Sequence, residues 1–307
     1  MRGRERFTIW LRAVRIPFLS AAAMPVLIGT AVAWYEKGFF DPSVFFLTFL
    51  GAVLLQAGTN LFNEYFDYIS GNDQINQFRH LPFNGGTGVI IEGKLSTAQV
   101  YSGAMICYAI GTIIGIYLAI TRGPFVFILG LFGLFSGYFY VGEPLKLAYR
   151  GIGEVVVGCN FGFFIVMGSY YVQVGTVSFL SVLVALPITL LITAVLYINQ
   201  FPDYEADRLV GKANLVVRLG RERAVKGYYF LMILSYSVLF ISVALGLMPH
   251  GVLLSIVSLP LVIKACGTLK RYYKQPIDLV PANSATLQIH LIVGLILSIT
   301  FIVMGFL

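Results

Sequence analysis

The chain has 307 residues, of which 58% are hydrophobic and 11% charged, and it carries a net charge of +7. Its mean hydropathy of +0.84 excludes an ordinary soluble domain, in which about a quarter of residues are charged. Only a lipid bilayer accommodates so much apolar side chain. Nothing resembles a soluble basic domain or a base-stacking surface, so nucleic acid is not expected as a partner.

Long uncharged runs predict about nine membrane-spanning helices. In chain order, the runs without Asp, Glu, Lys or Arg cover residues 16–35, 42–63, 95–121, 123–142, 155–202, 227–263 and 279–307. Turn-like residues at 173–178 divide the fifth run into two spans, and residues 248–251 divide the sixth. Because a span needs about 20 apolar residues, we expect a single all-α, multi-pass domain over residues 1–307.

The distribution of basic residues orients these spans. With the N-terminus inside, only Lys37 and Arg122 of the 21 basic residues lie in outer loops. The positive-inside rule therefore predicts a cell-membrane protein with a cytoplasmic N-terminus and an outer C-terminus. Two inner loops, at about 67–94 and 203–226, are longer than the outer turns, so we expect the functional site on the cytoplasmic face.

The first acidic cluster closes the second predicted span. It reads Asn63-Glu-Tyr-Phe-Asp67-Tyr-Ile-Ser-Gly-Asn-Asp73. Asn63 and Asp67 are four residues apart and therefore share one helix face. Gly71 is a predicted helix stop, which lets Asp73 turn back towards them.

The second acidic cluster lies at the end of the sixth predicted span. It reads Asn199-Gln-Phe-Pro-Asp203-Tyr-Glu-Ala-Asp207. Asn199, Asp203 and Asp207 recur every four residues, which places them on one face of a helix. Pro202 predicts a kink between them that weakens this alignment.

Carboxylates clustered at membrane depth indicate a compensating cation. Insertion of one ionisable residue costs roughly 2.5–3.5 kcal/mol, and neighbouring carboxylates repel one another. Hard oxygen ligands favour Mg²⁺, which bridges carboxylates to substrate phosphates. The alternative is that both clusters are solvated helix ends paired with nearby Arg or Lys. Two clusters on one face, each opening with Asn, favour the metal.

Basic residues follow each cluster and are candidates for binding the outer oxygens of a diphosphate. They are Arg79, Lys94, Lys146, Arg208 and Lys212. Lys146 is the best placed, since it follows Tyr138, Tyr140 and Pro144 just beyond a span. The Gly-Gly-Thr-Gly stretch at 85–88 also offers backbone N–H groups to phosphate.

At these residues the chain resembles the UbiA superfamily of intramembrane aromatic prenyltransferases. Asn63-x3-Asp67-x5-Asp73 is similar to the first motif of that family, and Asp203-x3-Asp207 to the second. Residues 140–151, Tyr-Val-Gly-Glu-Pro-Leu-Lys-Leu-Ala-Tyr-Arg-Gly, resemble its third region. The first motif and the Gly-Gly-Thr-Gly-Val-Ile-x-x-Gly-Lys-Leu-Ser stretch that follows it look most like the menaquinone-type branch. Glu64 departs from the pattern, because an Asp is more usual there.

The resemblance implies a ring of helices around a central cavity and transfer of a prenyl group from a prenyl diphosphate to an aromatic quinone precursor, with release of diphosphate. It implies two Mg²⁺ ions that bridge the diphosphate, held by Asn63, Asp67, Asp73, Asn199, Asp203 and Asp207. The residues expected to bind diphosphate are Arg79, Lys94, Lys146 and Lys212. Those expected to take part in catalysis are Asp67, Asp203, Tyr140 and Lys146, with the Tyr140 ring against the allylic cation.

Two alternative functions remain at this stage, namely prenyl transfer to a different substrate and cation-coupled transport. Related proteins apply the same chemistry to other substrates, such as geranylgeranylglyceryl phosphate in archaeal-type lipid synthesis, or in haem-type and chlorophyll-type prenylation. A cation-coupled transporter also carries paired intramembrane carboxylates, but its charges belong at the midplane, whereas these gather at one face.

Overall fold

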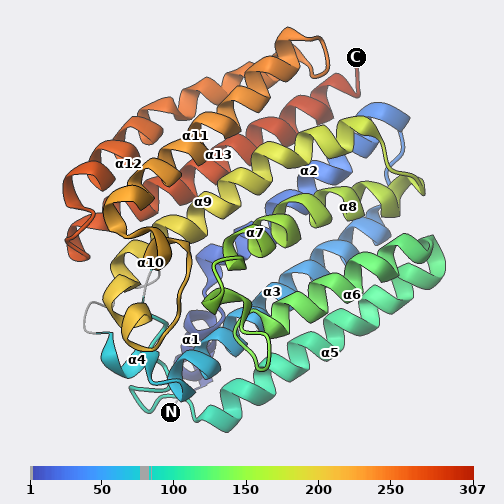
Figure 1. Cartoon of the computed structure of the whole chain (residues 1–307). Coiled ribbons are helices and arrows are strands. Elements are labelled where there is room, and N and C mark those ends of the chain that lie inside the picture. The colour runs from blue at the N-terminus through green and yellow to red at the C-terminus, as the bar shows by residue number, and fades with distance from the viewer. Residues whose placement is uncertain (1–2, 77–82, 84) are drawn as a thin grey trace.

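The structure of the chain, a computed structural model, describes residues 3–76, 83 and 85–307. The described part contains helices and no β-strand (Figure 1). Its α-helices are α1 (Gly3–Ala13), α2 (Ser20–Lys37), α3 (Pro42–Ile69), α4 (Asn72–Ile75), α5 (Thr97–Arg122), α6 (Pro124–Phe139), α7 (Gly153–Gly158), α8 (Ile165–Val174), α9 (Phe179–Leu209), α10 (Leu215–Leu219), α11 (Arg221–Ala244), α12 (Leu259–Tyr272) and α13 (Val280–Met304). A π-helical turn, η3 (Cys159–Phe164), joins α7 to α8, and short 3₁₀ segments precede α2, α12 and α13.

Eight helical segments in the described part are long and apolar enough to cross a membrane. The ninth apolar helix is α6, which has only 16 residues and therefore a length of about 24 Å against a hydrocarbon core of about 30 Å. The order of these nine helices confirms the expected all-α, multi-pass architecture. The short member is the fourth apolar helix in chain order.

Polar residues define where the long helices begin. Asp41 caps α3 by accepting hydrogen bonds from the backbone N–H groups of Ser43 and Val44. Ser96 and Ser178 open α5 and α9 with reciprocal capping boxes, in which side chain and backbone satisfy each other's unpaired groups. Local sequence therefore determines where α9 begins, directly after the connection that the sequence identified at 173–178.

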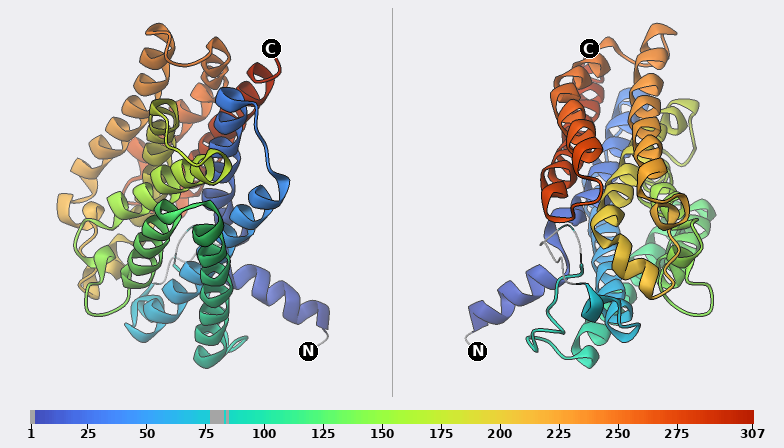
Figure 2. Two further views of the ribbon diagram at one scale, coloured as in Figure 1. Left: turned by 90° about the vertical axis from the view of Figure 1, so that its right-hand side faces the viewer. Right: turned by 60° about the vertical axis from the view of Figure 1, so that its left-hand side comes forward.

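The helices form a bundle whose N- and C-termini lie at opposite ends (Figures 1 and 2). The largest apolar core joins α2, α9, α11 and α13. A smaller core joins α1, α3, α5 and the segment around Val89–Leu95. The outer face of α5 exposes Ile106, Ile113 and Ile120, as expected of a helix that faces lipid.

Two helices continue beyond their apolar runs and carry the acidic clusters. Helix α3 runs to Ile69, so Asn63 and Asp67 are helical, and it ends before Gly71, whose φ of 81° is left-handed. Helix α9 continues through Pro202 to Leu209. Asn199, Asp203 and Asp207 therefore stay on one continuous helix in spite of the proline.

Candidate active site

A polar pocket of about 1010 Å³ lies between α3 and α9 at the end of the bundle nearer the N-terminus. Both acidic clusters line it. Its charged and amide-bearing lining residues are Arg15, Gln56, Asn60, Asn63, Asp67, Asn199, Gln200, Asp203, Asp207, Lys212 and Asn214. The helix periodicity that grouped each cluster on one face therefore also directs both clusters into one space.

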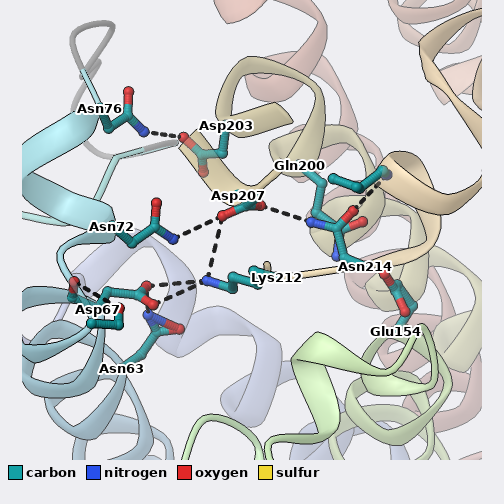
Figure 3. A network of polar contacts seen from close by, with 12 residues as sticks. Asn63, Asp67, Asn72, Asn76, Glu154, Gln200, Asp203, Asp207, Lys212 and Asn214 are labelled. Atoms are coloured by element: carbon teal, nitrogen blue, oxygen red, sulfur yellow. Dashed lines mark hydrogen bonds and ion pairs between the residues drawn. The ribbon is translucent and has the colours of Figure 1, made fainter. Parts of the chain in front are cut away.

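Lys212 joins the two clusters (Figure 3). Its ammonium nitrogen Nζ lies 3.1 Å from Asp67 Oδ1 and 3.7 Å from Asp207 Oδ1. Burial works to lower the pKa of Lys212, but the carboxylates of Asp67 and Asp207 outweigh burial and hold this pKa well above its ordinary value. The lysine is therefore cationic at physiological pH. Among the described residues it is the only basic side chain within 4 Å of Asp67, Asp203 or Asp207.

Amide side chains hold the second cluster in place. Asp207 accepts hydrogen bonds from Asn72 Nδ2 at 2.8 Å and Asn214 Nδ2 at 2.7 Å, and Asp203 accepts one from Asn76 Nδ2 at 2.7 Å. Asn72, inside the first cluster, begins α4, and Asn76 is the C-cap of that helix. The pairing of carboxylates with basic residues, which the sequence left open as an alternative, thus applies to Lys212 but leaves most of these contacts to amides.

Phe83 and Gly86, which come after α4 in the chain, line one side of the pocket. Gly86 lines the pocket, has a left-handed φ of 69°, and packs so closely on Asp73 that an added Cβ would lie 2.7 Å from both carboxylate oxygens. Glycine is therefore required at this position. Asp73 itself is buried but does not line the pocket directly. Its predicted role as a metal ligand stays a prediction.

Glu64 turns away from the other members of the first motif. It is fully buried, and its Oε2 accepts a hydrogen bond from Thr87 N at 2.6 Å and lies 3.5 Å from Arg15 Nη2. Arg12 binds the carbonyl oxygen of the same Thr87. The extra methylene that distinguishes Glu64 from the more usual Asp therefore spans the gap to the glycine-rich stretch.

Two lysines expected at the diphosphate lie outside the pocket lining. Lys94 Nζ pairs with Glu92 at 2.7 Å, and hydrogen bonds from Arg12 and Lys94 lower the pKa of Glu92 to about 2. Lys146 Nζ pairs with Glu143 at 2.8 Å and is 37% exposed. Each lysine is thus engaged with a surface carboxylate. Arg79 lies outside the described residues.

The remaining wall of the pocket contains one expected residue and several that sequence reasoning missed. Tyr140 lines the pocket, as expected of the wall around the reacting carbon. Tyr138 instead packs edge-on against Phe62 and Phe66. The missed residues are Arg15, Gln56, Asn60, Gln200 and Asn214 in the lining, with Asn72, Asn76 and Glu154 behind it. Gln200 was detectable as the neighbour of Asn199, and Arg15 as the last charge before the first span.

The carboxylates do not form a complete metal site by themselves. Within residues 3–76, 83 and 85–307, no three carboxylate, imidazole or thiolate side chains form a group that could hold a metal ion. The Asp and Asn side chains that line the pocket offer oxygen atoms as metal ligands, and Mg²⁺ prefers oxygen ligands. An ion bound here would need further ligands from a substrate or from water.

A second, apolar cavity of about 980 Å³ lies between α3, α5, α6 and the η3–α8 segment. It shares Thr59 and Phe161 with the polar pocket, so the two spaces adjoin. Its walls contain six glycines, namely Gly51, Gly111, Gly115, Gly130, Gly133 and Gly168, besides Gly137 beside Thr59. Added Cβ atoms at Gly115, Gly130 and Gly133 would meet nothing within 4 Å, so the absence of side chains leaves this space open.

Comparison with known proteins identifies relatives over nearly the whole chain. The UbiA prenyltransferase family matches residues 22–292. The chain is 29% identical over 294 residues to the 1,4-dihydroxy-2-naphthoate octaprenyltransferase of Bacillus subtilis, covering 94% of this chain and 90% of that protein. It is 35% identical over 223 residues to the Escherichia coli protein of the same description, covering 72% and 71% respectively.

Solved structures of UbiA homologues share this fold. A solved structure of a UbiA homologue from Archaeoglobus fulgidus, bound to GPP and Mg²⁺, superimposes with a TM-score of 0.67. The match covers 97% of this chain and 98% of that one at 18% sequence identity. At 18% identity the structural match shows a shared arrangement of helices and nothing more.

Proposed function

This chain belongs to the UbiA prenyltransferase family, and on that premise we propose that it transfers a prenyl group from a prenyl diphosphate to an aromatic, naphthoate-type substrate within a membrane. One observation carries the proposal. The ammonium group of Lys212 contacts Asp67 of α3 and Asp207 of α9, so both aspartate motifs border a single pocket. A diphosphate with its metal fits such a place, because acidic groups from two sides can share the cation.

Six oxygen-donor residues are our candidates for Mg²⁺ binding. Five of them line the pocket and Asp73 packs against pocket-lining Gly86; the set is Asn63, Asp67, Asp73, Asn199, Asp203 and Asp207. When bound, Mg²⁺ neutralises the charge that builds on the diphosphate as it leaves. We propose that these residues would hold two ions together with the diphosphate, since the described carboxylate, imidazole and thiolate side chains form no complete site by themselves.

Lys212 and Arg15 are the described cations best placed for the diphosphate. Both line the pocket. Lys212 balances Asp67 and Asp207, and its ammonium group, with three N–H donors, would also bind diphosphate oxygens in this pocket. Arg15 is anchored by Glu64 through one Nη, which leaves other N–H groups of the guanidinium for an anion. Lys94 and Lys146 would have to leave their present partners to take part.

The reaction itself exchanges one bond at the allylic carbon. The C–O bond to the diphosphate breaks and its electron pair leaves with the diphosphate. A ring carbon of the aromatic substrate then forms the new C–C bond. The ring recovers aromaticity by losing the hydrogen on that carbon as a proton, or a carboxylate on that carbon as CO₂, and the electrons of the broken bond return to the ring. The ring faces of Tyr140 and Phe161, both in the lining, would stabilise the allylic cation and exclude water from it.

The apolar cavity fits the tail of the prenyl group. It begins at Thr59 and Phe161, which border both spaces, and its walls are mainly aliphatic, aromatic and glycine residues. A chain of isoprene units can leave the polar pocket there without exposing itself to water. Burial of its methylene groups would add about 0.8 kcal/mol each to binding.

We further propose that the pocket opens to the cytoplasm of a cell-membrane protein. The excess of basic residues at the end of the bundle that holds the pocket supports this orientation. Single cysteines introduced in a cysteine-free background at Glu222, which lies near that end, and at Gly246, which follows α11 at the other, would test it. A membrane-impermeant thiol reagent should label only the Gly246 position in intact cells, and labelling of only the Glu222 position would reverse the assignment.

The proposed activity is tested with purified protein in lipid nanodiscs. Labelled prenyl diphosphates of several lengths are combined with 1,4-dihydroxy-2-naphthoate, 4-hydroxybenzoate and geranylgeranylglyceryl phosphate. We expect a prenylated naphthoquinol, formed only with Mg²⁺ and abolished by EDTA. Product from geranylgeranylglyceryl phosphate alone would overturn the aromatic substrate, and Mg²⁺-independent turnover would overturn the metal assignment.

A further inference from the structure

Gln200 places an unpartnered carbonyl group at the polar pocket. The residue lies on α9 between Asn199 and Asp203, lines the pocket and is 7% exposed. Its Nε2 donates a hydrogen bond to Glu154 Oε1 at 2.8 Å. Its Oε1 is buried and has no hydrogen-bond partner among the described residues. A buried carbonyl group without a donor is costly, so a bound donor would complete the site.

Glu154 determines which end of the Gln200 carboxamide is free. Glu154 is fully buried, and its Oε1 also accepts a hydrogen bond from Leu215 N at 2.8 Å. Because the NH₂ end of Gln200 is held at Glu154 Oε1, the carbonyl oxygen is the end of the carboxamide that is left without a partner among the described residues.

Two glycines bring Glu154 this close to α9. A Cβ added to Gly158 would lie 2.0 Å from Thr193 Oγ1, and one added to Gly162 would lie 2.4 Å from Thr189 Cα. The α7–η3 segment therefore packs directly on the backbone of α9, as small residues allow in membrane helices. Glu154 lies one helical turn before Gly158 in the chain, next to Gln200.

A second buried glutamine borders the pocket but lies farther from the carboxylates. Gln56 Oε1 is also buried without a partner. However, Gln56 and Asp67 are 11 positions apart on α3, a helical distance of about 16 Å. Gln200 lies within one turn of Asp203. A substrate that must reach the carbon attached to the diphosphate will meet Gln200 first.

We propose that the Gln200 carbonyl oxygen accepts a hydrogen bond from a ring hydroxyl group of the aromatic substrate, with Glu154 as the positioning residue that orients it. The inference rests on the function proposed above. It has a chemical consequence, because a hydroquinone offers two O–H donors, the corresponding quinone offers none, and each monomethyl ether lacks one of the two. The site therefore selects the reduced, hydroxyl-bearing form of its substrate.

The test compares substrates with and without the donor. Wild-type protein in nanodiscs is assayed with saturating Mg²⁺ and prenyl diphosphate against 1,4-dihydroxy-2-naphthoate and its two monomethyl ethers. We expect one of the two ethers to lose about 10- to 100-fold in kcat/KM, the value of one buried hydrogen bond. In Gln200→Leu the diol should lose a similar factor, and the difference between diol and that ether should shrink to about threefold or less.

Further variants separate positioning from general damage. Glu154→Gln supplies an NH₂ group that lets the Gln200 amide turn around, so it should also reduce the kcat/KM ratio between the diol and the ether. Glu154→Asp keeps a carboxylate, so its ratio should lie between those of wild type and Glu154→Gln. KM for the prenyl diphosphate should stay unchanged in Gln200→Leu. Ile198→Val, a buried change on the same helix outside the pocket lining, is the matched control and should keep the wild-type ratio.

The outcomes distinguish this inference from the function on which it rests. A wild-type ratio between diol and ether in Gln200→Leu would overturn the role of Gln200 while leaving prenyl transfer intact. Failure of wild-type protein to prenylate any aromatic substrate would overturn the proposed function itself. If Gln200→Leu fails to fold by size-exclusion chromatography, Gln200→Asn is used, since its shorter amide withdraws the carbonyl and should reduce the ratio as well.

Discussion

The two aspartate motifs are balanced by different chemistry. Asp67, in the first motif, faces a cation, Lys212, which belongs to the loop after the second motif. Asp203 and Asp207, in the second motif, are held by amides, of which Asn72 lies within the first motif and Asn76 follows it. Each motif thus supplies the groups that stabilise the other. Neither motif is complete until α3 and α4 have packed against α9 and the loop that follows it.

The largest expected effect comes from removing either motif's central carboxylate. Asp67→Ala and Asp203→Ala should each lower prenyl transfer by at least about 10³-fold, because metal-assisted charge stabilisation at the diphosphate depends on both sides of the pocket. Activity is measured by product formation in nanodiscs, with folding checked by thermal melting. Substantial turnover in either variant, while wild type still requires Mg²⁺, would show that one motif suffices.

Lys212→Met should give the next largest effect and sharpen the contrast between cation and amides. Loss of a buried charged hydrogen-bonding group should raise KM for the prenyl diphosphate, with kcat/KM falling about 10²-fold. The variant also leaves Asp67 and Asp207 without their ammonium partner, so its melting temperature should fall. Mg²⁺ should raise that temperature more in the variant than in wild type, because ligands stabilise by mass action. An equal Mg²⁺ response in both proteins would contradict this balance.

Asn72→Ala should have a moderate effect that reports on the amide side. It removes the 2.8 Å hydrogen bond to Asp207 without removing a carboxylate. Groups that orient metal ligands typically contribute about 10- to 100-fold to metal affinity or activity. The apparent Mg²⁺ affinity, from activity titrations, should fall in this range, and Asn214→Ala should behave alike. A variant with unchanged Mg²⁺ dependence would show that Asp207 needs no orientation.

Gly133→Leu should affect only long substrates. An added side chain at Gly133 meets nothing within 4 Å and enters the apolar cavity. We expect kcat/KM to fall about tenfold for long prenyl diphosphates, through the loss of one or two buried isoprene methylene contacts, and to stay unchanged for a ten-carbon donor. Gly267→Leu, which is equally open but lies outside this cavity, is the control. Equal losses for short and long donors would place the tail elsewhere.

The smallest effects are expected at Lys94 and Lys146. Each is engaged with a surface carboxylate outside the pocket lining, and exposed ion pairs contribute only about 0–1 kcal/mol. Lys94→Met and Lys146→Met should therefore retain activity within about threefold. A loss comparable with that of Lys212→Met in either variant would support the diphosphate role that the sequence pattern indicated.

The apolar helices and the faces that carry the acidic residues could be predicted from local sequence. Uncharged runs of span length predicted the apolar helices, since hydrophobic length follows from the thickness of the bilayer. Spacings of four residues placed Asn63 with Asp67, and Asn199 with Asp203 and Asp207, because these intervals follow the helix repeat. Those inferences need no knowledge of how one helix packs on another, and for the same reason the resemblance to a family was visible in the residues themselves.

Only the tertiary structure decided which groups serve the pocket. Lys94, Lys146 and Lys212 are all lysines near a motif, and the sequence favoured Lys146, yet of the three only Lys212 lines the pocket between α3 and α9. The partnership of Glu154 with Gln200 depends on how closely the glycines of α7 and η3 approach α9. The direction of a side chain across a helix interface depends on packing between segments far apart in sequence, and no local pattern encodes that.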